Sequence, residues 1–261
     1  MKSTTNIFPW LAIVMFFGGC MLVEKIEPPK RVLFIGNSYT HGNNLPALFT
    51  NMVNSADGKV PLVKSYTPGG YTLIKHSKDP KALALIDEGN WDVVVLQGNS
   101  QEAARSEESE STRNDFLTGG MSLGKRILEK SPHARIILYQ TWARHPDFWK
   151  SSDKNSSVGS SPEEMQKRTH KWYSKLASAI PGGATVAPVG DAWAMSYAKN
   201  PGLLLHVKDN SHPAFSGSYL AGLVLYRTIY TGNPLSAIHF KGSLTDKDAA
   251  ALKVTAELKI P

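Results

Sequence analysis

The stretch Arg31–Ser38 reads Arg-Val-Leu-Phe-Ile-Gly-Asn-Ser, and the change of character inside it decides the fold. Val32 to Ile35 form a continuous apolar run, which is typical of a strand buried on both faces. The run stops at a glycine, and from Leu45 onward apolar residues recur at helical spacing. A buried strand that leads through a short polar turn into an amphipathic helix is the unit from which parallel α/β sheets are built.

The same alternation continues to the end of the chain. Further strands are expected at residues 60–66, 91–96, 135–139 and 184–189, and helices at 45–53, 80–86, 114–130, 162–180, 193–197, 213–226 and 245–258. This order predicts a parallel sheet with right-handed crossovers and helices on both faces. The sequence of residues 31–261 contains no internal repeat and no Pro-rich linker, so we expect one domain.

The composition is that of a globular protein with a sizeable core. Of the 261 residues, 41% are hydrophobic and 20% are charged, which argues against disorder and against a coiled coil. The net charge of +7 comes from scattered Lys and Arg rather than from a basic run. We therefore expect no nucleic-acid partner and interpret the charge as a contribution to solubility, with some attraction to anionic surfaces or polysaccharides.

The N-terminus has the features of an export signal. Lys2 supplies a positive charge, and Ile7–Gly18 is apolar but too short for a transmembrane helix, which needs about 20 residues. Phe17-Gly18-Gly19-Cys20 then resembles a bacterial lipobox, in which small residues precede a cysteine that receives a lipid. We expect residues 1–19 to be a lipoprotein signal peptide. The alternative is an ordinary signal peptide or an uncleaved anchor.

Cys20 is the only cysteine in the chain, which excludes an intrachain disulfide and a cysteine nucleophile elsewhere. We expect Cys20 to be lipidated, residues 20–30 to form a tether and residues 31–261 to form the domain. The protein would then be exported and held in the bacterial cell envelope, with its lipid anchor as the only contact with the membrane.

Polar residues follow the ends of the predicted strands. Ser38 lies just past the first strand, Gly69–Gly70 past the second and Asn99 past the third. The carboxyl ends of parallel strands share one edge of the sheet, where ligands bind in such folds. The sequence Asp209-Asn-Ser-His212-Pro precedes a late helix whose amino end can approach the same edge. We therefore expect these segments to meet there.

The residue types in these segments suit nucleophilic catalysis. A serine hydroxyl such as that of Ser38 is a poor nucleophile unless a neighbouring base takes its proton. His212 suits the role of the base, and Asp209 can orient it and stabilise the imidazolium. The oxyanion needs preset donors, for which the backbone N–H groups of Ser38 and Gly70 and the side-chain amide of Asn99 are the candidates.

These segments resemble the sequence blocks of the SGNH (GDSL-like) hydrolases, and the resemblance covers about residues 31–232. Gly36–Thr40 is similar to the first block, with Asn37 at a place where many members carry aspartate. Gly69–Thr72 is similar to the second block, and Asp209–Pro213 is similar to the last and most specific one.

The third block departs from the family pattern. Most members read Gly-x-Asn-Asp there, whereas this chain has Gln-Gly-Asn-Ser-Gln at 97–101. Asn99 is the candidate for the oxyanion donor, and Gln97 and Gln101 are the alternatives.

The resemblance implies a flavodoxin-like three-layer α/β/α sandwich whose five-stranded parallel sheet has the order 2-1-3-4-5. It also implies hydrolysis of esters, often acetyl esters on carbohydrates, without a metal or another cofactor. The substrate would be a small-molecule or glycan ester. Trp142 and Arg144, which follow the fourth strand, and Asn37 are candidates for binding it. A tryptophan at this place is equally consistent with core packing.

Several alternatives stay open at this point. A lysophospholipase or thioesterase would use the same fold, and a glycan-binding lipoprotein would carry the triad without using it. His206, Asp209 and His212 are also metal-ligand types, but no further ligand type flanks them. Gly119–Lys125 matches the start of a phosphate-binding loop, but Arg126 stands where Ser or Thr should hold magnesium, so we interpret the match as chance.

Overall fold

The computed structural model describes residues 27–150 and 157–258, so the predicted signal peptide, Cys20 and most of the expected tether lie outside the described residues. The strands are β1 (Arg31–Ile35), β2 (Leu62–Tyr66), β3 (Val93–Leu96), β4 (Arg135–Tyr139) and β5 (Thr185–Ala187). The α-helices are α1 (Ser38–His41), α2 (Leu45–Ser55), α3 (Leu73–His76), α4 (Pro80–Asp87), α5 (Glu102–Arg105), α6 (Glu110–Lys130), α7 (Pro162–Ala179), α8 (Val189–Lys199), α9 (Phe215–Ile229) and α10 (Asp246–Glu257). Short 3₁₀ helices are η1 (Gly42–Asn44), η2 (Pro146–Lys150) and η4 (Leu235–Ala237).

The strands form one parallel sheet in the order β2-β1-β3-β4-β5, which confirms the predicted fold class. β1 lies inside the sheet, where Val32 pairs with Val63 of β2 and Val93 of β3. The chain therefore reverses its direction of winding between β1 and β3. The carboxyl edge beside that switch point is where ligands bind in open α/β sheets.

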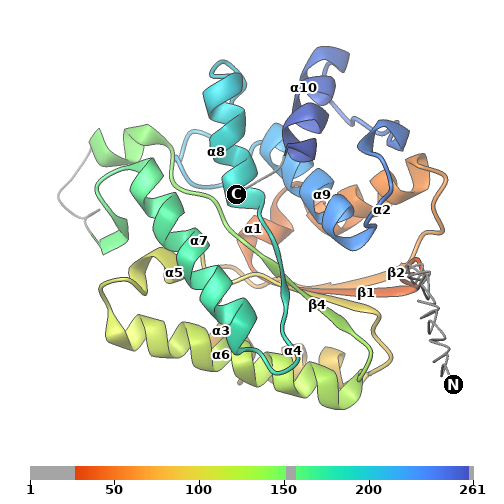
Figure 1. The fold of residues 1–261 in the computed structure, drawn as a ribbon, viewed down its shortest axis with the longest axis vertical. Helices are drawn as coiled ribbons and strands as arrows, with labels where there is room; N and C mark the ends of the chain where they lie inside the picture. The colour runs from red at the N-terminus through yellow and green to blue at the C-terminus, as the bar shows by residue number, and fades with distance from the viewer. Residues whose placement is uncertain (1–26, 151–156, 259–261) are drawn as a thin grey trace, which may run out of the picture.

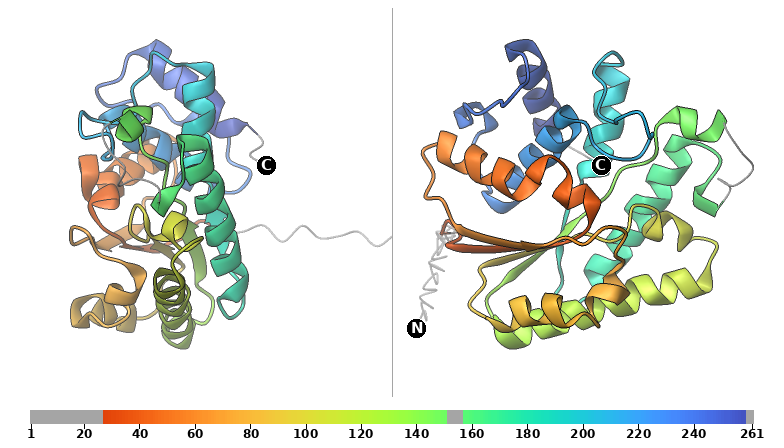
Figure 2. Two further views of the ribbon diagram at one scale, coloured as in Figure 1. Left: turned by 90° about the vertical axis from the view of Figure 1, so that its left-hand side faces the viewer. Right: turned by 180° about the vertical axis from the view of Figure 1, so that it is seen from behind.

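Helices cover both faces of the sheet, as Figures 1 and 2 show. Helices α2, α8, α9 and α10 pack on one face, and α3, α4, α6 and α7 pack on the other. Because neighbouring strand residues point to opposite faces, Phe34 belongs to the first core and Leu33 and Ile35 to the second. In the described part of the chain, no helix is both long enough and apolar enough to cross a membrane.

The structure differs from the sequence expectations mainly at short elements. Helices α1, α3 and α5 have four residues each and were not predicted, because so short a segment shows no helical period. Strand β2 begins after Pro61, which has no N–H to donate to a ladder. Helix α9 begins at Phe215 rather than at Pro213, because Pro213 forms an isolated antiparallel bridge with His206.

The phosphate-loop match at Gly119–Lys125 lies in the middle of α6, which confirms that it is a chance match. Its glycines serve close helix packing. A Cβ on Gly119 would collide with the backbone of α3, and one on Gly120 would collide with the side chain of Leu176. The glycine spacing thus lets α6 approach α3 and α7 closely.

We predict that Gly119→Ala destabilises the protein by about 2 kcal/mol, because the backbone of α3 cannot give way as a flexible side chain would. The measurement is urea unfolding of residues 21–261 followed by circular dichroism. Gly202→Ala is the control, because its Cβ would meet no atom within 4 Å. Equal midpoints for the two variants would contradict the prediction.

Candidate active site

The turn that follows β1 presents Ser38 at the edge of the sheet. Gly36 is packed so tightly that a Cβ there would collide with the hydroxyl of Thr40. Asn37 is the N-cap of α1, and its side-chain oxygen accepts the backbone N–H of Tyr39 at 3.1 Å. Ser38 is the first residue of α1 and is half-buried. The cap thereby fixes the backbone from which the Ser38 hydroxyl projects.

The structure brings Ser38, His212 and Asp209 into one chain of hydrogen bonds, although Ser38 and His212 are 174 positions apart. His212 Nε2 lies 2.9 Å from Ser38 Oγ, and His212 Nδ1 lies 2.5 Å from Asp209 Oδ2. Because a carboxylate only accepts, Nδ1–H donates to Asp209 and Nε2 is left to accept from the serine hydroxyl. This tautomer is the one that a histidine needs to remove a proton from serine.

Asp209 is held as a carboxylate. Its Oδ1 accepts the backbone N–H groups of Ser211 at 2.9 Å and His212 at 2.8 Å. Burial raises the pKa of Asp209, but the hydrogen bonds from the His212 side chain and from these N–H groups outweigh it and keep the pKa below its ordinary value. Asp209 is therefore charged at neutral pH and remains an acceptor for Nδ1–H of His212.

Buried side chains fix the loop that carries Asp209 and His212. The indole N–H of Trp142 donates to the carbonyl of Ser211 at 3.0 Å. At the start of the loop, His206 Nε2–H donates to the carbonyl of Ala143 at 3.1 Å, and its Nδ1 accepts the hydroxyl of Tyr197 at 2.7 Å. Burial lowers the pKa of His206 to about 4, so the ring is neutral at pH 7. Since both ring nitrogens are used, His206 is not a metal ligand.

Trp142 is a core residue rather than the sugar-binding platform expected as one possibility. Its ring is 1% exposed and is stacked on Tyr39 at a centroid distance of 4.2 Å and on Trp193 at 3.8 Å. A ring with both faces covered has no face left for a sugar. The predicted substrate-binding role of Trp142 is therefore wrong.

Asn37 is also unavailable to a substrate, because it is 2% exposed and its whole carboxamide is in use. Besides capping α1, it donates from Nδ2 to the carbonyls of Tyr71 at 2.9 Å and Gly98 at 3.1 Å. Asn37 thus ties the turn after β1 to the loops after β2 and β3, and its predicted role in substrate binding is corrected to one of support.

Arg144 is committed to contacts within the protein. Its Nη1 donates to the hydroxyl of Tyr39 at 2.8 Å, and its Nη2 donates to the hydroxyl of Ser100 at 2.9 Å. The guanidinium joins the serine turn to the loop after β3. These contacts argue against the expected sugar-binding role of Arg144.

The candidate oxyanion donors lie on the three loops that Asn37 connects. In the described part of the chain, the backbone N–H groups of Ser38 and Gly70 donate no hydrogen bond to another residue. Asn99 Oδ1 accepts the N–H of Gln101 at 3.2 Å, which turns its Nδ2 towards the carbonyl of Gly70 at 3.4 Å. The amide of Asn99 and the glycine turn are therefore neighbours, as a shared anion site requires.

Of the two alternatives to Asn99, Gln97 is disfavoured by its contacts. It is fully buried, and its side-chain oxygen accepts the N–H of Asn37 at 2.9 Å and the hydroxyl of Thr40 at 2.8 Å. Its Nε2 contacts the carbonyl of Gly98. Gln97 therefore supports the serine turn from below, while Gln101 stays an untested alternative.

Sequence reasoning missed Glu102, which lies beside Asn99. Glu102 belongs to a polar, acidic segment, in which the sequence does not distinguish a buried glutamate from an exposed one. The structure buries it to 4% exposure and hydrogen-bonds it to the backbone of Asn99 at 2.9 Å. The one signal in the sequence is its position, because Glu102 directly follows the third block at 97–101.

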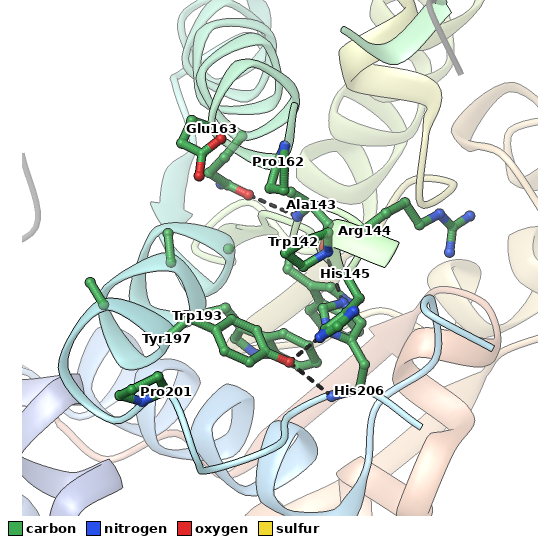
Figure 3. Close-up of a pocket in the computed structure, with 15 residues that line it drawn as sticks. Trp142, Ala143, Arg144, His145, Pro162, Glu163, Trp193, Tyr197, Pro201 and His206 are labelled. Atoms are coloured by element: carbon green, nitrogen blue, oxygen red, sulfur yellow. Dashed lines mark hydrogen bonds between the residues drawn. The ribbon is translucent and has the colours of Figure 1, made fainter. Parts of the chain in front are cut away.

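A cavity of about 510 Å³ lies beyond the ends of β4 and β5, and Figure 3 shows its lining. Aromatic rings, prolines and alanines form most of its wall, while the guanidinium of Arg144 points away from it. None of the three residues Ser38, His212 and Asp209 lines it. The residues that the structure describes contain no group of three His, Cys, Asp or Glu side chains that could hold a metal ion.

Comparisons with known proteins found similarity in structure but none in sequence. No family model matches the chain, and no curated protein matches it in sequence. Among solved structures, a protein of the DUF4886 family from Bacteroides uniformis is similar, with a TM-score of 0.70, 15% identity and coverage of 87% of this chain and 92% of that one.

Two further structures are named for esterase or lipase activity. A protein described as a GDSL-like lipase from Parabacteroides merdae has a TM-score of 0.58 and 15% identity, and the match covers 79% of this chain and 98% of that one. A catalytic mutant of an acetylxylan esterase from Geobacillus stearothermophilus has a TM-score of 0.50 and 15% identity, with 83% and 97% covered. At such identity the likeness shows the fold alone. The chain shares the three-layer α/β/α fold of these proteins, which is the fold expected from its sequence blocks.

Proposed function

We propose that this protein is a serine esterase that acts through an acyl-enzyme on Ser38. The observation that carries the proposal is the hydrogen-bond chain from Ser38 Oγ through His212 to Asp209, at 2.9 and 2.5 Å. A serine in a polar turn is common. A serine whose hydroxyl faces the unprotonated Nε2 of a histidine, with a charged aspartate at Nδ1, suits nucleophilic catalysis.

The reaction follows from the positions of these groups. Ser38 Oγ attacks the ester carbonyl carbon while His212 Nε2 takes the hydroxyl proton. The tetrahedral intermediate breaks its bond to the alcohol oxygen, and the imidazolium returns the proton to that oxygen. Water then attacks the acyl carbon while His212 takes one of its protons. The bond between that carbon and Ser38 Oγ breaks, the imidazolium returns the proton to Oγ, and the acid leaves. During both steps the N–H groups of Ser38 and Gly70 and the amide of Asn99 donate to the oxyanion.

We propose short-acyl, and above all acetyl, esters on glycans as the substrate. The side chains of His212 and Asp209 are 46% and 48% exposed, so a bulky alcohol can reach the triad. The apolar cavity would suit a longer acyl chain, but Ser38 does not line it, and Trp142, which does, is stacked on Tyr39. The similar acetylxylan esterase supports a glycan ester.

We also propose that the enzyme is exported and anchored in the bacterial cell envelope through a lipid on Cys20. The sequence of residues 1–20 supports this location. Acylated glycans at the cell surface would then be within reach of the domain.

We predict that residues 21–261 hydrolyse p-nitrophenyl acetate and that Ser38→Ala and His212→Ala each lower kcat by about 10³-fold or more, with intact circular dichroism spectra. Ser178→Ala, which removes an exposed hydroxyl from α7, is the control and should keep the wild-type rate. Faster turnover of long-chain than of acetyl esters would favour a lysophospholipase or thioesterase. Equal rates in all variants would mean that the hydrolysis is background chemistry, and would favour a glycan-binding protein that does not use the triad.

We predict that Asn99→Ala lowers kcat for p-nitrophenyl acetate by about 10²–10³-fold with little change in KM, because it removes a donor that acts in the transition state. Gln101→Ala is the matched variant on the same loop and should change kcat less than about threefold. A loss confined to Gln101→Ala would assign the donor to that residue instead.

A further inference from the structure

Glu102 is a buried carboxylate without an ion pair in the described structure. It is the first residue of α5, follows the loop of Asn99 and is 4% exposed. Its Oε1 is buried and has no hydrogen-bond partner among the described residues. Burying a carboxylate without a cation costs stability, so its presence calls for a function.

The contacts of Glu102 join the two loops that carry candidate oxyanion donors. Its Oε2 accepts the N–H of Asn99 at 2.9 Å, in the loop after β3, and the N–H of Leu73 at 3.4 Å, at the start of α3, where the loop after β2 ends. Gly98 makes room for it, because a Cβ there would lie 3.0 Å from Oε2. One oxygen atom therefore spans the gap across which Asn99 and Gly70 face each other.

We propose that the ionised carboxylate of Glu102 is a positioning residue that holds these two loops at the separation the oxyanion hole requires. The inference rests on the proposed function and adds to it a control of the same site by pH. Glu102 does not touch the substrate. It acts through the backbone of Asn99 and Leu73.

The surroundings of Glu102 bring its ionisation into the physiological range. Burial raises its pKa to about 7, against the hydrogen bonds from Asn99 and Leu73. The charged or titratable groups that face it are Asp115 on α6, which raises the pKa, Lys75 on α3, which lowers it, and Tyr173 on α7, whose own pKa is raised by burial and by the charge of Glu102.

Protonation of Glu102 should loosen the site. Hydrogen bonds to an ionised carboxylate are about twice as strong as those to a neutral group, so the loops are held more firmly above pH 7 than below it. The stability of the fold changes in the opposite direction. Because the pKa lies above that of an unfolded glutamate, the stabilising contribution of the protonated form is present below about pH 4.5 and is lost as pH rises through about 7.

The test is the ratio of kcat for wild type to kcat for Glu102→Gln, measured on p-nitrophenyl acetate from pH 5 to pH 9. Gln has the shape of the protonated glutamate, and any pH dependence that the two proteins share cancels in the ratio. We expect a ratio near one at pH 5.5 that rises to about tenfold above pH 8 with a midpoint near 7, and an unchanged KM. Tenfold is less than the 10²–10³ of a deleted donor, because the donors stay present but shift.

Glu107→Gln is the matched control, since it removes the same charge five positions further on, where Glu107 binds Lys171 and the indole of Trp172 instead of the loops. Its ratio should not vary with pH. A second measurement does not depend on whether Glu102→Gln folds. In Ser38→Ala, which retains Glu102, the amide nitrogen and proton resonances of Asn99 and Leu73 should titrate together with a midpoint near pH 7.

The outcomes separate this inference from the proposed function. An active wild type with a ratio that stays constant over pH, or with amide resonances of Asn99 and Leu73 that do not titrate near pH 7, overturns the role of Glu102 and leaves the esterase intact. A wild type without hydrolysis overturns the proposed function, and with it the catalytic meaning of Glu102. A pH-dependent ratio together with titrating amides supports the inference.

Discussion

The stacking of Trp142 on Tyr39 is the contact on which the alignment of this site depends. Tyr39 directly follows Ser38 in the chain, and the indole N–H of Trp142 holds the carbonyl of Ser211, directly before His212. One buried ring therefore sets the position of Ser38, the proposed nucleophile, against that of His212, the proposed base. Trp193 covers the opposite face of the ring and joins this contact to the core above the sheet.

A second set of contacts supports the site from beneath, and it is made almost entirely of carboxamides. Gln97 accepts from the serine turn, and Asn37 donates to the loops after β2 and β3. Neutral amides suit this place, because they satisfy several buried backbone groups without the desolvation cost of a charge. Glu102 is the exception in this cluster. Burying its carboxylate costs more than burying an amide, and the role proposed for it depends on its charge.

The sequence was sufficient for the parallel sheet and for the meeting of Ser38, His212 and Asp209, because buried parallel strands show as apolar runs and their carboxyl ends share one edge. The order of the strands came from the resemblance of the sequence blocks to a known family. It was insufficient for Asn37 and Trp142. Asn37 directly precedes Ser38, and Trp142 follows β4 at the same edge of the sheet, but neither position reveals that the side chain is buried in the core. The burial of Glu102 likewise depends on helices that pack against α5, and one of them, α7, is far from it in the sequence.

The division between exposed reactive groups and buried supports bears on how such a site selects its substrate. His212 and Asp209 are nearly half exposed, whereas the residues that fix them are covered. The geometry of the proposed triad is thus set by the fold, and little of a substrate's binding energy would be needed to assemble it. Discrimination must then come from the rim. There Asn37 and Glu102 both link the segments that follow β2 and β3, and of these two links only the proposed one through Glu102 is ionisable and could respond to pH.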